Sequence, residues 1–193
     1  EDVTLQYPGA EEPVIADISV DLAPGKTTAV IGATASGKST MVNLLPRLMD
    51  PASGRISVEG GAGESAAVNT RDVDLSELRD RISVVPQHAY LFSGTIASTV
   101  AGKAAEDLTD ADRDRVLWAL KGAQAWEFVQ EMDDQIDASV DTGGANFSGG
   151  QRQRLSIARA LYRDADLYVF DDSFSALDYA TDARLRLALP EYT

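Results

Sequence analysis

Residues 32–39 read Gly-Ala-Thr-Ala-Ser-Gly-Lys-Ser and match the pattern G-x-x-x-x-G-K-[ST]. A β-rich run at 27–31 precedes this loop and apolar residues at helical spacing follow it, so the sequence predicts strand, loop and helix in that order. The glycines let the backbone turn tightly and direct successive N–H groups inward at a helix N-terminus, where an anion is stabilised. Lys38 can reach the β- and γ-phosphates of a nucleotide, and the Ser39 hydroxyl can ligate Mg²⁺.

A second element fits the same phosphates. Residues 167–170 are Leu-Tyr-Val-Phe, which predicts a buried central strand, and Asp171 follows directly. Such a strand can deliver the Asp171 carboxylate to Mg²⁺. Alone this is a weak indication, because apolar strands often end in Asp at a turn. Together with the glycine loop it predicts a nucleotide-binding core.

Strands and helices alternate around the glycine loop, which is typical of an α/β fold. The region between Gln87 and Gly150 is largely helical and reads as an insertion, so we expect a core at 1–87 and 151–193 and a helical subdomain at 88–150. Residues 60–67 are rich in Gly, Ala and Ser and predict a mobile surface loop. Predicted strands cover 3–7, 55–59, 82–85 and 167–170, and predicted helices cover 75–81, 109–132 and 151–163.

Composition excludes several classes of protein. The 193 residues predict one domain, and a net charge of −14 excludes a protein that coats nucleic acid. The absence of cysteine excludes disulfides and Cys-ligated zinc, and a single histidine, His88, excludes a multi-His metal site. No apolar run reaches the length of a membrane span, and no signal peptide opens the sequence. Because the chain opens without Met, we expect it to be a piece of a longer polypeptide.

The stretch Phe147-Ser148-Gly149-Gly150-Gln151 opens the predicted helix at 151–163. Ser148 and Gln151 have the spacing of a capping box, and a well-capped helix is the simplest interpretation. The two glycines also leave N–H groups bare at the positive end of a helix, which is a second anion-binding surface. One chain rarely needs two anion-binding surfaces for one phosphate, unless two chains share nucleotides between them.

With these motifs in this order, the sequence resembles the nucleotide-binding domain of ABC transporters over nearly its whole length. Residues 32–40 resemble the Walker A loop, 147–151 the LSGGQ signature, and 167–171 the Walker B strand. Ser-Ala-Leu-Asp at 175–178 resembles the D-loop. Leu-Phe-Ser-Gly-Thr-Ile at 91–96 resembles the exporter branch.

The resemblance implies a P-loop NTPase core of RecA type, with an antiparallel β subdomain and an inserted α-helical subdomain. Tyr7 resembles the aromatic residue that stacks on adenine, although an aromatic at a strand end is as often a packing residue. Gln87 resembles the Q-loop glutamine, which touches Mg²⁺ and the attacking water. The resemblance implies that ATP is bound by Tyr7, Gly32, Thr34, Ala35, Ser36, Gly37, Lys38, Ser39 and Thr40. It implies that Mg²⁺ is held by Ser39, Gln87 and Asp171. The residues implied to act from a second chain are Ser148, Gly149, Gly150 and Gln151, with Asp178 in the D-loop.

The implied activity is ATP hydrolysis coupled to transport, at the cytoplasmic face of the cell membrane. The implied partners are the transmembrane domain of the same transporter and a second nucleotide-binding domain, without nucleic acid. Two alternatives are a soluble ABC ATPase acting on DNA or ribosomes and an interaction module with a dead site. The exporter-like stretch and the lack of a basic face oppose the first, and intact Lys38 and Asp171 oppose the second.

Three features depart from the family pattern. Asp172 stands where most members have the catalytic glutamate, Phe147 replaces Leu, and no histidine follows Asp172 for the switch loop. His88 is expected to be a loop residue. Asp at position 172 resembles the degenerate half of heterodimeric exporters, which predicts slow hydrolysis and a non-identical partner. The alternative is that a backbone shift compensates and the homodimer works normally.

Overall fold

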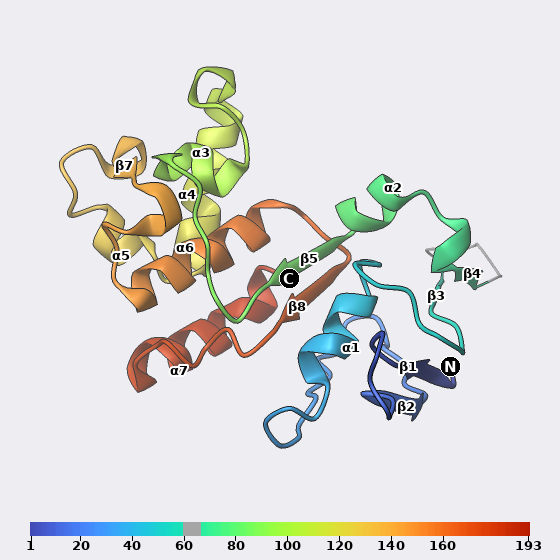
Figure 1. Ribbon diagram of the computed structural model, residues 1–193. Coiled ribbons are helices and arrows are strands. Elements are labelled where there is room, and N and C mark those ends of the chain that lie inside the picture. Colours follow the sequence, from blue (N-terminus) through green and yellow to red (C-terminus); the bar gives the residue numbers. More distant parts are fainter. Residues whose placement is uncertain (60–66) are drawn as a thin grey trace. The chain divides into compact units, whose positions relative to one another are not determined.

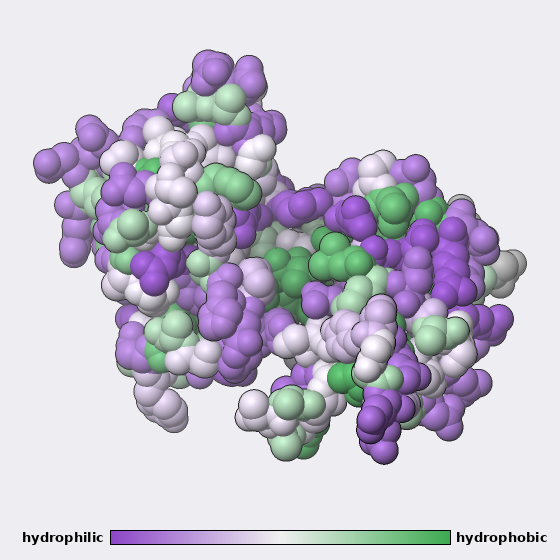
Figure 2. All heavy atoms as spheres, in the orientation of Figure 1, coloured by the Kyte–Doolittle hydropathy of each residue, from purple (hydrophilic) through white to green (hydrophobic). Residues whose placement is uncertain are grey.

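The computed structural model describes residues 1–59 and 67–193, which form two compact units, Glu1–Ile82 and Ser83–Thr193 (Figure 1). All but the last residue of the predicted loop at 60–67 lies outside the described residues. Hydrophilic residues, drawn purple, cover much of the face of each unit seen in Figure 2, as the net charge of −14 leads one to expect. The predicted division into a core and a helical subdomain at 88–150 is finer than these units and stays a prediction.

Within its described residues, the first unit contains two antiparallel strand pairs and two short α-helices. Strand β1 (Val3–Leu5) pairs with β2 (Ile15–Ile18), and β3 (Ser57–Val58) pairs with β4 (Val68–Asn69). Alternation along β1 directs two apolar side chains to one face, where they pack with α1 (Lys38–Leu44). The 3₁₀ turn Thr70–Asp72 leads to α2 (Leu75–Asp80), whose first N–H groups are capped by Asp74. The core of this unit consists of Val3, Leu5, Ile15 and Leu44.

The strand predicted at 27–31 is wrong: these residues adopt no regular structure, and Ile31 is 92% exposed. A strand needs a neighbour that pairs with its N–H and C=O groups. Within the described residues, the four strand pairs do not include this run. Its β-forming composition therefore does not suffice, because strand preference reflects packing on a partner strand.

The second unit is built around three packed helices. Helices α3 (Ile96–Ala101), α4 (Asp110–Gly122) and α6 (Gly149–Tyr162) enclose a core that is continuous with the short antiparallel pair β6 (Gly94–Thr95) and β7 (Ser139–Val140) (Figure 1). The fully buried side chains Val116, Leu120, Leu155 and Leu161 come from α4 and α6. Further elements are α5 (Trp126–Val129), α7 (Tyr179–Ala188) and the 3₁₀ turns Ala105–Asp107, Gln135–Asp137, Thr142–Gly144 and Leu189–Glu191.

The helical stretch predicted at 109–132 consists of two helices. Gln124 adopts a left-handed backbone (φ 55°), and the Ala125 N–H donates to the Leu120 carbonyl at 2.8 Å. This six-residue closure ends α4, and α5 begins after it.

Strand β5 (Ile82–Val85) pairs with β8 (Leu167–Phe170), with the boundaries that the sequence predicts. All four β8 residues are half-buried, so the prediction of a buried central strand is wrong for the described structure, in which β8 pairs with β5 alone. The C-terminal ends of these strands carry Gln87 and Asp171, the residues that the sequence assigns to nucleotide chemistry.

Candidate nucleotide site

The glycine loop at 32–37 turns sharply into α1. Ala35 (φ 64°) and Gly37 (φ 86°) both have left-handed backbones, and Gly37 caps the helix. A Cβ atom at Gly37 would lie 2.8 Å from the Val14 carbonyl oxygen, so the loop needs glycine there both for its backbone angle and for space. The sequence thus builds the strained entry to a helix N-terminus on which phosphate-binding loops depend.

The Lys38 ammonium group lies inside the curve of this loop. Its Nζ donates to the carbonyl oxygens of Gly32 at 2.9 Å and Ala33 at 2.7 Å, and to the Ser36 hydroxyl at 3.3 Å. All three acceptors are exposed loop groups. Phosphate oxygens can replace these acceptors without leaving the charge unsolvated, because a charge-assisted bond to an anion is the stronger interaction.

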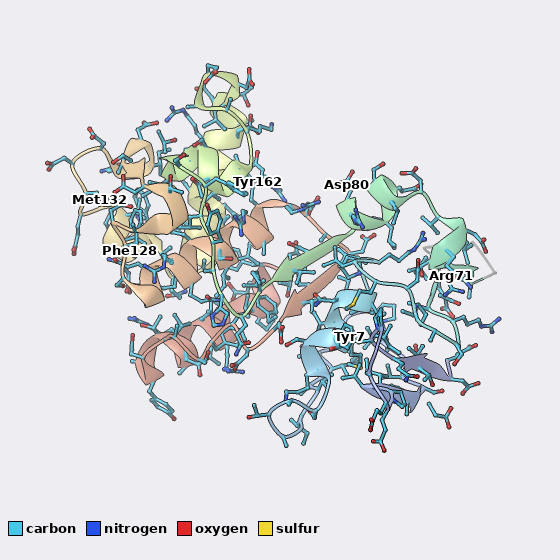
Figure 3. All side chains as sticks on the ribbon, viewed as in Figure 1. Tyr7, Arg71, Asp80, Phe128, Met132 and Tyr162 are labelled. Carbon is cyan, nitrogen blue, oxygen red and sulfur yellow. The ribbon has the colours of Figure 1, made fainter. Side chains whose placement is uncertain are left out.

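Tyr7 is tied to the first turn of α1. Its hydroxyl is hydrogen-bonded to the Thr40 hydroxyl at 3.1 Å, while 42% of the residue stays exposed (Figure 3). The ring is therefore held beside the helix that follows the glycine loop, with surface left for a flat ligand to stack on. Its assignment to adenine remains a prediction.

In the second unit, Asp171 and Asp172 follow β8 and take different backbone conformations. The Asp171 N–H donates to the Val85 carbonyl at 3.0 Å, and Asp172 is left-handed (φ 45°). The two residues therefore do not continue the alternation of the strand, because the strand ends at Phe170 and the chain turns at Asp172. This turn allows the Gln87 side-chain N–H to donate to Asp172 Oδ2 at 3.1 Å.

The signature segment forms the capped start of α6. The Ser148 hydroxyl accepts from the Gln151 N–H at 3.2 Å, and the Gln151 side chain accepts from the Ser148 N–H at 2.9 Å. Phe147 is 5% exposed and packs against Phe128 at 6.2 Å between ring centroids (Figure 3). The simple interpretation of the motif, a well-capped helix, is thus confirmed.

The glycines of the signature differ in their surroundings. A Cβ atom at Gly149 would meet nothing within 4 Å, whereas one at Gly150 would lie 3.2 Å from the Ala176 carbonyl oxygen. The first turn of α6 is therefore open beside Gly149 and closed by the D-loop segment beside Gly150. The N-terminus of α6 is the positive end of the helix dipole, which favours an anion, and the first turn has no acidic residue that would repel it.

Asp178 and His88 have structural surroundings that the sequence leaves open. The Asp178 carboxylate caps α7 by accepting from the Thr181 N–H at 3.0 Å, and its hydrogen bonds to Thr181 lower the pKa of Asp178. His88 is exposed in the loop after β5, as the sequence predicts.

Motif matching missed Ser173, which is buried beside Asp172, because no pattern in the sequence marks it.

The donor groups fit magnesium chemistry. The structure describes no cluster of three His, Cys, Asp or Glu side chains outside 60–66 that could hold a metal ion. Protein-bound Mg²⁺ commonly uses one or two carboxylates together with substrate phosphates and waters. A hydroxyl at Ser39, an amide oxygen at Gln87 and a carboxylate at Asp171 are such oxygen donors, the first in one unit and the other two in the second.

The motifs of this chain are those of a known protein family. Residues 15–175 match the family described as ABC transporter. The chain belongs to the ABC transporter family. Its ATP-binding domains have the P-loop NTPase fold, and the mixed helix and strand content of this ABC domain agrees with it. The resemblance deduced from the motifs is confirmed.

Relatives of this ABC domain include exporters. An ATP-dependent lipid A-core flippase of Thiobacillus denitrificans is 42% identical over 188 residues, which cover 97% of this chain and 31% of that protein. An uncharacterized ABC transporter ATP-binding protein of Mycobacterium bovis is 46% identical over 96% of this chain and 30% of its own length. A bacterial Atm1-family ABC exporter with ATP bound has a TM-score of 0.84 and 29% identity, over 99% of this chain and 31% of that one.

The chain therefore spans about a third of the length of these relatives. In the part of the chain that the structure describes, no helix is both long and apolar enough to cross a lipid bilayer.

Proposed function

We propose that this ABC domain binds Mg-ATP, dimerises around it and couples its slow hydrolysis to transport by an exporter. The observation that carries the proposal is the glycine loop, whose left-handed turn at Ala35 and Gly37 gathers the Lys38 ammonium group at the N-terminus of α1. The finer fold assignment, an antiparallel β subdomain and a helical subdomain at 88–150 on a RecA-type core, belongs to the same proposal.

Each residue has a defined task in this proposal. Lys38 exchanges its loop carbonyl partners for the β- and γ-phosphates, and the backbone N–H groups of 34–40 hold the phosphates in place. Ser39, Gln87 and Asp171 would hold Mg²⁺ through their oxygen atoms, and the ion would neutralise charge on the phosphates. The start of α6 covers the nucleotide of a second chain through Ser148, Gly149, Gly150 and Gln151, and its surface is open beside Gly149.

Asp172 supports slow hydrolysis. A group that orients the attacking water must lie within hydrogen-bond reach of it. Aspartate is shorter than the usual glutamate by about one C–C bond, roughly 1.5 Å, and misplacements near 1 Å can cost on the order of 10²-fold in rate. The Asp172 carboxylate also accepts a hydrogen bond from the Gln87 side-chain amide, and this bond holds the carboxylate beside Gln87.

A slow site fits a chain whose partner is non-identical and brings the competent glutamate. We propose such a second nucleotide-binding domain and a transmembrane domain as partners, at the cytoplasmic face of the membrane. The names of the lipid A-core flippase and the Atm1-family exporter favour an exporter, and nothing among these relatives favours the soluble ATPase acting on DNA or ribosomes.

Calorimetric titration with Mg-ATP tests the proposal through Lys38→Ala. The matched control is Lys26→Ala, which removes an exposed lysine from the same unit but outside the glycine loop. We expect Lys38→Ala to weaken binding at least about tenfold, which equals a loss of about 1.4 kcal/mol, and Lys26→Ala to leave it unchanged. Equal affinities of wild type and Lys38→Ala would contradict the proposal.

A further inference from the structure

Ser173 is buried directly after Asp172, with 1% of the residue exposed. Its hydroxyl donates to the Val85 carbonyl oxygen at 2.8 Å. The same oxygen accepts the Asp171 N–H at 3.0 Å. One carbonyl group at the end of β5 thus holds the residues on both sides of Asp172.

We propose that Ser173 is a positioning residue for Asp172 and Gln87. The inference rests on the proposed function for its meaning in hydrolysis, but its geometry lies wholly within the second unit. Val85 precedes Gln87 by two residues, so the carbonyl that anchors Ser173 also sets where the Gln87 segment leaves β5. The hydroxyl of Ser173 therefore anchors the Asp172 end of the hydrogen bond between Gln87 and Asp172 to the strand that leads to Gln87.

The left-handed backbone of Asp172 follows from this double anchor. For the Asp171 N–H and the Ser173 hydroxyl to reach one oxygen, the chain between them must turn back, and Asp172 takes φ 45°. Aspartate enters this region more readily than most residues, because its short polar side chain can bond locally. Beyond the turn, the Ser175 hydroxyl donates to the Asp172 carbonyl at 2.9 Å.

Removing the Ser173 hydroxyl would release one anchor while leaving the other. The turn could then relax toward an extended backbone, which swings the Asp172 carboxylate away from the Gln87 amide. Ser173 touches neither Gln87 nor the nucleotide in this scheme and acts only through Asp172. Its loss should therefore change the rate of hydrolysis more than the affinity for ATP.

The test compares Ser173→Ala with Ser83→Ala. Ser83, in strand β5, is a matched control, because it is 2% exposed. Its hydroxyl also donates to a backbone carbonyl oxygen, that of Ala160, at 3.0 Å. The readout is the NMR shift of the Gln87 side-chain amide protons in the nucleotide-free chain, measured at one fixed pH. Asp172→Ala gives the position of the same signals when Gln87 has lost this acceptor.

We expect Ser173→Ala to move the Gln87 amide signals most of the way to their position in Asp172→Ala, and Ser83→Ala to leave them at the wild-type position. In ATPase assays, kcat should fall about tenfold in Ser173→Ala with KM unchanged. Gln87 amide signals that stay at the wild-type position in Ser173→Ala, or that move equally far in Ser83→Ala, overturn the inference.

If Ser173→Ala does not fold, the wild type decides. Its Ser173 hydroxyl proton should then give a slowly exchanging signal close to the Asp171 amide proton, and the absence of that signal overturns the inference. Because the Gln87 amide measurement uses no nucleotide, it is independent of the calorimetric titration with Mg-ATP. A chain that fails to bind Mg-ATP would refute the proposed function and leave the role of Ser173 standing or falling on its own result.

Discussion

Replacing Asp172 with glutamate should change stability and hydrolysis in opposite directions. Asp172 is left-handed (φ 45°), a conformation that costs an L-residue roughly 1–2 kcal/mol and that aspartate adopts several-fold more often than other residues. We therefore expect Asp172→Glu to lower the free energy of unfolding by about 1 kcal/mol, or the melting temperature by about 2–4 °C. The added methylene extends the carboxylate by roughly 1.5 Å, which should raise ATP turnover by about tenfold or more.

The assay measures unfolding in denaturant and ATPase rate side by side, with and without a candidate partner domain. Asp164→Glu is the matched control, because Asp164 is also left-handed (φ 57°) and also exposed, and no motif of the sequence includes it. It should lose similar stability and gain no turnover. Brisk hydrolysis by the wild-type chain alone, with no gain in Asp172→Glu, would refute the reasoning that the site is slow because its carboxylate is short.

Two further predictions concern the signature and the helical unit. Gly149→Glu should fold as well as the wild type, because open space surrounds the position and a carboxylate suits a helix N-terminus. In light scattering, Gly149→Glu should abolish the association that Mg-ATP drives, whereas Gly149→Ala should retain it. If Gly149→Glu associates as well as the wild type, the signature does not belong to the nucleotide interface. The pKa of Asp112 is lowered by hydrogen bonds from Lys103 at 2.7 Å and from the Tyr162 hydroxyl at 2.5 Å. The ionised Asp112 carboxylate therefore stabilises the fold at pH 7, and this stabilisation is lost as the pH falls from the ordinary pKa of 3.8 toward the lowered pKa of the folded chain. Asp112→Asn should therefore lower the free energy of unfolding at pH 7 and less so near pH 2, whereas the exposed Asp114→Asn should do little at either; a pH-independent difference for Asp112→Asn would contradict this.

Local patterns predicted the parts of this fold that local physics determines. The Ser148 and Gln151 capping box and the limits of β5 and β8 follow from spacing and polarity along the chain. The strand expected at 27–31 failed because pairing depends on a distant partner that composition does not reveal.

The candidate site shows the same limit. The motifs identified Gln87 and Asp172 separately, but the hydrogen bond between them joins residues that lie 85 positions apart. The left-handed turn at Asp172 and the buried Ser173 hydroxyl arise where two strand ends meet, and neither has a sequence pattern.

The central claim is that the loop at 32–40 holds the phosphates of ATP. The most direct measurement follows the backbone amide NMR signals of the chain during titration with Mg-ATP and, separately, with Mg-AMP, which lacks the β- and γ-phosphates. The account predicts that Mg-ATP shifts the amide signals of 32–40 most strongly and that Mg-AMP leaves most of them in place. Equal shifts with both nucleotides, or shifts that spare 32–40, would contradict it.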